Sequence, residues 1–145
     1  MLVYESLDSV LNEWREPVLD RHLDDFNADF TIEFNVKNPD WRGIHDKAAE
    51  TESMFGSFTN KLAEECYDEI CQTIKEDDNW YIDGWSFAGR SAGWFALLCK
   101  GDSEFVSEDD LNTIEEIVEK YFKMFNSGFK QFYKDQFNQR KFLSK

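Results

Sequence analysis

The segment Gly89-Arg90-Ser91-Ala92-Gly93 carries the residue types and spacing of a catalytic motif. Its G-x-S-x-G pattern is typical of the nucleophile elbow of serine hydrolases, in which a tight turn between a strand and a helix exposes a serine hydroxyl. The elbow requires an acid and then a histidine later in the chain to activate the serine. Both histidines, His22 and His45, precede Ser91. We therefore predict a glycine-framed hairpin tip, since glycine accepts the positive φ that such tips require, and a protein that is not an enzyme.

The sequence also contains no pattern that is typical of a metal or cofactor site. Cys66 and Cys71 lie five residues apart, so they do not share a helical face, and the two histidines are isolated. Asp77-Asp78 lacks the glycine-bearing loop of a calcium hand. We expect no metal and no cofactor. Three cysteines without a paired spacing, no run of roughly 18–20 apolar residues and no secretory signal favour a cytoplasmic protein, in the host cytoplasm if the chain is phage-encoded.

Charge divides the chain into two unequal parts. Residues 1–119 hold 29 acidic and 9 basic side chains, a net charge of −20, whereas residues 120–145 hold 1 and 7, a net charge of +6. The overall charge of −14 disfavours non-specific binding to nucleic acid or to an anionic membrane, because phosphate affinity comes from lysine and arginine. It favours a basic protein surface as partner.

The carboxylates that we expect to contact such a partner recur at spacings of three and four residues. Like charges at these spacings weaken a helix by a few tenths of a kcal/mol each, so a sequence that repeats them is a candidate for using their field. The alternative is an ordinary solvated face. The candidates are Asp20, Asp24, Asp25, Asp29, Glu64, Glu65, Asp68, Glu69, Glu115, Glu116 and Glu119.

Two further sets of residues could bind a partner. Arg90 and Trp94 lie at the expected hairpin tip, and these residue types are enriched at binding hot spots. A stripe of lysines follows one side of the last helix and could hold phosphates or the acidic surface of a second copy, giving a homodimer. This basic stripe consists of Lys120, Lys123, Lys130 and Lys134.

The elements that position these residues follow from hydrophobic periodicity. Residues 30–37 alternate apolar and polar without a fault, and residues 81–88 and 94–100 read as two more strands. Helical spacing covers residues 7–14, the segment after Pro17 up to Phe26, and about 44–75. Ser107 can cap a long amphipathic C-terminal helix. We predict one α+β domain over residues 1–145, with a small three-stranded antiparallel sheet packed against three to four helices.

Residues 85–95, W-S-F-A-G-R-S-A-G-W-F, resemble a known signature. They are similar to the G-R-S-G-G-W segment of small uncharacterised proteins from bacteriophages and related mobile elements, with Ala92 where those carry glycine. The resemblance covers about eleven of 145 residues. It implies a phage origin, and small acidic phage proteins often inhibit host defence nucleases, some by mimicking nucleic acid.

Charge and resemblance together lead to the expected function. We expect a non-enzymatic, anti-CRISPR-like inhibitor whose anionic surface occupies the basic nucleic-acid-binding cleft of a nucleic-acid-processing complex. The alternative is a nucleic-acid-binding or dimerising module that uses the basic C-terminal helix.

Overall fold

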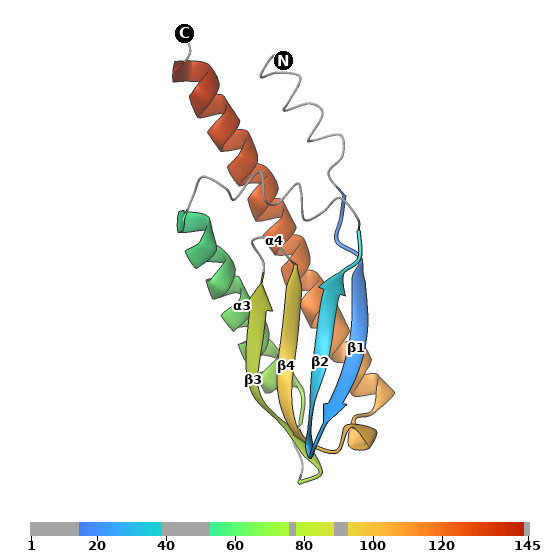
Figure 1. Ribbon diagram of the computed structural model, residues 1–145. Helices are drawn as coiled ribbons and strands as arrows, with labels where there is room; N and C mark the ends of the chain where they lie inside the picture. The colour runs from blue at the N-terminus through green and yellow to red at the C-terminus, as the bar shows by residue number, and fades with distance from the viewer. Residues whose placement is uncertain (1–14, 39–52, 76–77, 89–92, 144–145) are drawn as a thin grey trace.

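The computed structural model describes residues 15–38, 53–75, 78–88 and 93–143, and the structural statements below concern these residues. They form an α+β fold in which both α-helices lie on one face of a single sheet (Figure 1). The elements are β1 (Leu19–Phe26), β2 (Asp29–Val36), α3 (Ser53–Thr73), β3 (Trp80–Ala88), β4 (Trp94–Gly101), the short 3-10 helix η1 (Ser103–Phe105) and α4 (Glu108–Leu143).

The sheet has four antiparallel strands in the order β1-β2-β4-β3, so the prediction of three strands is wrong. The prediction of three to four helices is also wrong for the described residues, which form two α-helices. The helix expected at residues 7–14 and the start of the one expected from residue 44 lie outside the described residues.

The extra strand is β1, which the sequence pattern assigned to a helix. Leu19 and Leu23 are four residues apart, a spacing that places two side chains on one face of either a helix or a strand. The pairing with β2 decides between them, because all eight residues of β1 find a partner there. A two-residue connection closes the hairpin, with Asn27 at φ 54, a left-handed conformation that asparagine adopts more readily than most residues.

The core fills the space between the sheet and the two helices. Alternate residues of β2, of which Phe30, Ile32 and Phe34 are 0% exposed, face this layer. Ile70 on α3 and Ile114 on α4 are equally buried on the helical side. Burying side chains of this size contributes about 1.5–3 kcal/mol each, so the sheet–helix layer is the main source of stability.

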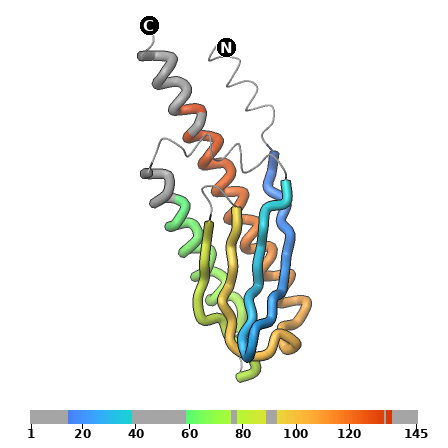
Figure 2. The backbone as a smooth tube through the Cα atoms, in the orientation of Figure 1, coloured from blue at the N-terminus to red at the C-terminus, as the bar shows by residue number. Residues whose placement is uncertain are grey.

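The long C-terminal helix is confirmed. The backbone N–H of Asp110 donates to the Ser107 hydroxyl at 3.0 Å, the expected N-cap. With 36 residues, α4 is about 54 Å long at 1.5 Å per residue, about twice the length of an eight-residue strand. It therefore extends past the end of the sheet, as the tube in Figure 2 shows.

Polar contacts fix α4 against its neighbours. Arg21 of β1 reaches Glu108 at 2.7 Å and Glu115 at 3.3 Å. On the other side, Lys120 and the Tyr121 hydroxyl both donate to Glu69 of α3. These contacts tie the helix to one edge strand and to α3. In the part of the chain that the structure describes, no helix is both long and apolar enough to cross a membrane.

Candidate functional site

The sheet has a second face on which neither described helix packs (Figure 1). Strand alternation and the register place sixteen side chains on this open face, in four rows that each cross β1, β2, β4 and β3 in turn. The rows are Asp20, Asn35, Trp94 and Ala88; His22, Glu33, Ala96 and Ser86; Asp24, Thr31, Leu98 and Gly84; and Phe26, Asp29, Lys100 and Tyr81.

Carboxylates gather on the β1–β2 half of this face. Glu33 lies directly opposite His22 and diagonally from Asp24, with which it can share a hydrogen bond when one of the two carboxyl groups is protonated. The His22 Nε2 lies 2.9 Å from an Asp20 carboxylate oxygen. We call Asp20, Asp24 and Glu33 the carboxylate cluster. Partial burial of Glu33, followed by its hydrogen bond and like charge with Asp24, raises the pKa of the Glu33 carboxyl above its ordinary value.

This arrangement disfavours the ionised Glu33 carboxylate. Its partial burial and the like charge of Asp24 raise its pKa, and the Thr31 hydroxyl and His22 counter these causes only in part. Like charges on neighbouring strands destabilise a sheet by roughly 0.2–1 kcal/mol. A group whose folded pKa is raised is protonated more readily in the folded than in the unfolded chain. The stability that Glu33 contributes in its protonated form is therefore lost as the pH rises through its raised pKa.

Glu33→Gln should consequently stabilise the protein. We expect the free energy of unfolding at pH 7 to increase by a few tenths of a kcal/mol up to about 1 kcal/mol. The gain should disappear below about pH 4, where Glu33 is protonated in both states. Urea denaturation at pH 7 and pH 3.5 measures both values. Glu64→Gln, on the exposed side of α3, is the matched control and should change little; a loss of stability in Glu33→Gln would show that the ionised carboxylate helps the fold.

The end of the β1–β2 hairpin carries a second group of acids. Asp29 accepts from Lys100 at 2.9 Å, which raises the pKa of the Lys100 ammonium. Beside this pair lies a surface hollow of about 570 Å³ whose walls include Asp25, Asp102 and Glu104. The described residues contain no group of three or more His, Cys, Asp or Glu side chains placed to hold a metal ion.

The helical carboxylates divide into paired and solvated residues. Glu69 binds Lys120 at 2.6 Å, Glu115 binds Arg21, and Glu119 lies 3.2 Å from Lys123 on the same helix. The rest are exposed on α3 and α4; they are Glu64, Glu65, Asp68 and Glu116. Positive and negative charges therefore alternate where the two helices meet, and the helices present no continuous anionic face there.

The basic stripe is interrupted by the same contacts. Lys120 and Lys123 are held in ion pairs, whereas Lys130 and Lys134 make none with the described residues. Trp94 is half-buried at one end of the open face, and Arg90 lies outside the described residues, as does Ser91. The hairpin tip thus provides one described partner-binding candidate, Trp94, which belongs to the open face.

Sequence reasoning missed four residues of this face. Glu33 and His22 complete the charged half, and Leu98 and Tyr81, which are 41% and 44% exposed, stand out of the other half. A signal for Glu33 was available, since the alternation in residues 30–37 already placed it outward. His22 could be found only by recognising β1 as a strand.

The comparisons with known proteins add no relative. No family model, curated protein or solved structure matches this chain. The function must therefore be argued from the site alone.

Proposed function

We propose that the protein is a non-enzymatic interaction protein whose acidic sheet surface binds a basic protein surface, and that its partner is a nucleic-acid-binding cleft. The observation that carries this proposal is the carboxylate cluster on the open face. Asp24 and Glu33 lie beside each other at the expense of stability. A lysine or arginine from a partner would remove that repulsion, so binding energy is available at this place.

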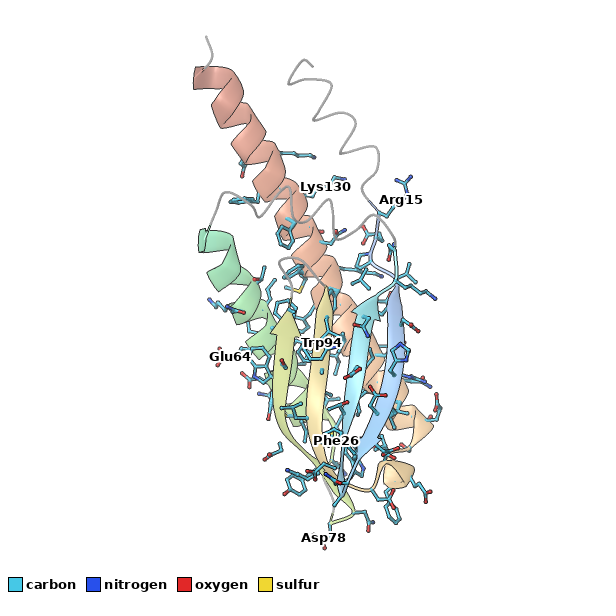
Figure 3. All side chains as sticks on the ribbon, in the orientation of Figure 1. Arg15, Phe26, Glu64, Asp78, Trp94 and Lys130 are labelled. Atoms are coloured by element: carbon cyan, nitrogen blue, oxygen red, sulfur yellow. The ribbon has the colours of Figure 1, made fainter. Side chains whose placement is uncertain are left out.

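The distribution of charge supports the same surface. Arg15 and Lys130 lie toward one end of the long axis, whereas Asp78 and the β1–β2 hairpin lie at the other (Figure 3). Acids of the hairpin end continue the anionic region beyond the carboxylate cluster, and Lys100 is held there by Asp29. Such a polarised field orients an approaching basic partner toward the sheet.

Inhibition of a nuclease is the specific form of this proposal. Clefts that bind nucleic acid are lined with Lys and Arg, and carboxylates fixed on a sheet can occupy them in place of phosphates. Strands hold side chains more rigidly than loops do, so little ordering entropy opposes binding. The resemblance of residues 85–95 to phage proteins is consistent with this role.

The test is affinity capture from a bacterial lysate with the full chain as bait. Asp24→Lys/Glu33→Lys should lose at least 90% of a basic nucleic-acid-binding protein that the wild type retains, and 0.5 M salt should release that protein from the wild type. The control Glu64→Lys/Glu65→Lys makes the same change in charge on α3 and should retain it. Added DNA should compete with the captured protein.

Two results would contradict the proposal. One is an unchanged set of captured proteins with Asp24→Lys/Glu33→Lys. The other is a gel shift of DNA by the protein alone at low salt that Lys130→Glu/Lys134→Glu removes, because that result assigns binding to the basic stripe.

A further inference from the structure

The open face is not uniformly acidic, because its β4–β3 half is apolar apart from Ser86 and from Lys100, which pairs with Asp29. Leu98 and Tyr81 are exposed large side chains in adjacent rows at one end, and Trp94 stands at the other. Phe26, 48% exposed, ends the same row as Tyr81. Large exposed apolar residues that gather on one face mark an interaction surface, whereas scattered ones do not.

Small residues lie between these large ones. Gly84 and Ser86 on β3 and Ala96 on β4 separate Leu98 from Trp94 along the sheet. A Cβ added at Gly84 would meet only the Leu98 side chain, at 3.6 Å. Ala96 is fully buried, so the β4–β3 half presents Gly84 and Ser86 between exposed large side chains, beside the carboxylate cluster.

A β-bulge determines which side chains of β3 reach this face. Ile82 pairs with Cys99 and Gly84 with Leu98, so Asp83 is the extra residue of β3. Without the bulge, strict alternation from Tyr81 would bring Trp85 to the open face. The bulge instead places Trp85 against the core and leaves Gly84 and Ser86 on the open face. Bulges often re-aim side chains at binding sites.

From these observations we propose that the open face binds an amphipathic, basic α-helix of the partner, with its apolar stripe over β4 and its lysines or arginines over the carboxylate cluster. This inference rests on the proposed function and names the partner element. Charge complementarity decides the occupant, because the adjacent β1–β2 half of the face is acidic. A second copy is disfavoured because each chain carries a net charge of −14, so two copies repel.

The dimensions suit a helix. Trp94 and Leu98 are four residues apart on β4, which separates them by about 13–14 Å. Residues i and i+8 on one side of a helix are separated by about 12 Å. A helix about 10–12 Å wide that lies over β4 also covers β3 and β2, since strands are about 4.8 Å apart. Its flank then faces β1, which carries Asp20 and Asp24.

The experiment uses three labelled 18-residue peptides and the full chain, with fluorescence anisotropy as readout. The first peptide has leucines in one helical stripe and lysines along one flank. The second has the same composition in shuffled order, and the third has glutamate in place of lysine. We expect the striped basic peptide to bind at least tenfold more tightly than the shuffled one and the acidic peptide not to bind.

Matched variants locate the binding. Leu98→Gln and Tyr81→Gln should each weaken the striped peptide about tenfold, and Asp24→Lys/Glu33→Lys should weaken it more. Phe105→Gln, which removes a still more exposed ring outside the open face, and Glu64→Lys/Glu65→Lys should leave the affinity within twofold. Circular dichroism of each variant shows whether it is folded. Because Leu98→Gln and Tyr81→Gln are two separate variants of the same face, the conclusion does not depend on one of them alone.

The outcomes distinguish the two proposals. If both basic peptides bind equally and only Asp24→Lys/Glu33→Lys weakens them, the proposed function stands and the helix-docking inference is overturned. If every variant binds both peptides alike, both proposals fail. A dimer in sedimentation that Leu98→Gln dissociates would assign the face to a second copy and would also overturn the inference.

Discussion

Gly101→Ala should destabilise the protein by at least about 3 kcal/mol. Gly101 has φ +106, a conformation that L side chains rarely adopt. A Cβ there would lie 2.2 Å from the backbone oxygen of Asn79 and 2.8 Å from the Cα of Trp80. Both contacts are with backbone, so neither can be relieved by rotating a side chain. The substitution must move the end of β4 away from β3.

The position explains why the effect should spread. Gly101 pairs with Trp80 across the two strands, and its N–H donates to the Ala28 oxygen at 3.2 Å, at the connection between β1 and β2. Trp80 is 2% exposed and packs against Phe30, with ring centroids 6.1 Å apart and ring planes tilted by 52°. Displacing β4 here therefore disturbs the core as well as the turn.

Gly84→Ala is the matched control for this prediction. It makes the same chemical change in the neighbouring strand, but its Cβ would meet only a Leu98 methyl at 3.6 Å, an ordinary van der Waals contact. Because glycine weakens strands by roughly 0.5–1 kcal/mol relative to alanine, Gly84→Ala should be neutral or slightly stabilising. Guanidinium denaturation followed by circular dichroism measures both. Equal stability of Gly101→Ala and the wild type would contradict the backbone conformation described for β4.

The fold could be predicted from the sequence where one periodicity was unambiguous. The alternation of residues 30–37 and the cap at Ser107 gave β2 and α4 correctly. The prediction failed at β1, because Leu19 and Leu23 fit a strand and a helix equally well. Only the pairing with β2 distinguishes the strand from the helix. Local spacing does not contain a long-range pairing, which explains the missing strand.

The bulge at Asp83 limited prediction of the site in the same way. Strict alternation placed Tyr81, Trp85 and Phe87 on one face, whereas one extra residue sends Tyr81 outward and keeps the other two against the core. The apolar run of residues 95–99 likewise predicts a strand buried on both sides, whereas Leu98 is 41% exposed. The apolar half of the candidate site consists largely of residues affected by these two errors.

The charged half shows a different limit. The carboxylates could be found from the sequence, but their partners could not be predicted because they come from distant elements. In the sequence Glu69 appeared equivalent to Glu65, yet Glu69 binds Lys120 and Tyr121. Burial of the Tyr121 hydroxyl and its hydrogen bond to Glu69 raise the pKa of Tyr121 to about 12. Counting acids therefore overestimated the number of carboxylates that the helices offer a partner and underestimated the number on the sheet, where Glu33 was not among the candidates.

Phe125→Ala should have the other large effect, a loss of about 3–5 kcal/mol in the free energy of unfolding. Phe125 is 2% exposed and lies at the centre of a ring cluster that joins α4 to the edge strand β3. Its ring meets Phe87 edge-on at 5.4 Å and Phe129 at 4.7 Å, geometries that add to the effect of burial. Truncation would leave a cavity bounded by the sheet and the helix, both of which other contacts hold in place.

Two further variants make this prediction specific. Phe125→Leu keeps most of the volume and should lose less than half as much stability as Phe125→Ala. Phe105→Ala removes a ring that is 55% exposed and should change stability by no more than about 0.5 kcal/mol. Urea denaturation of all three orders them. If Phe125→Ala lost no more than Phe105→Ala, α4 could not pack on β3 through this ring, and other buried side chains of α4, such as Ile114 and Phe129, would have to hold the helix instead.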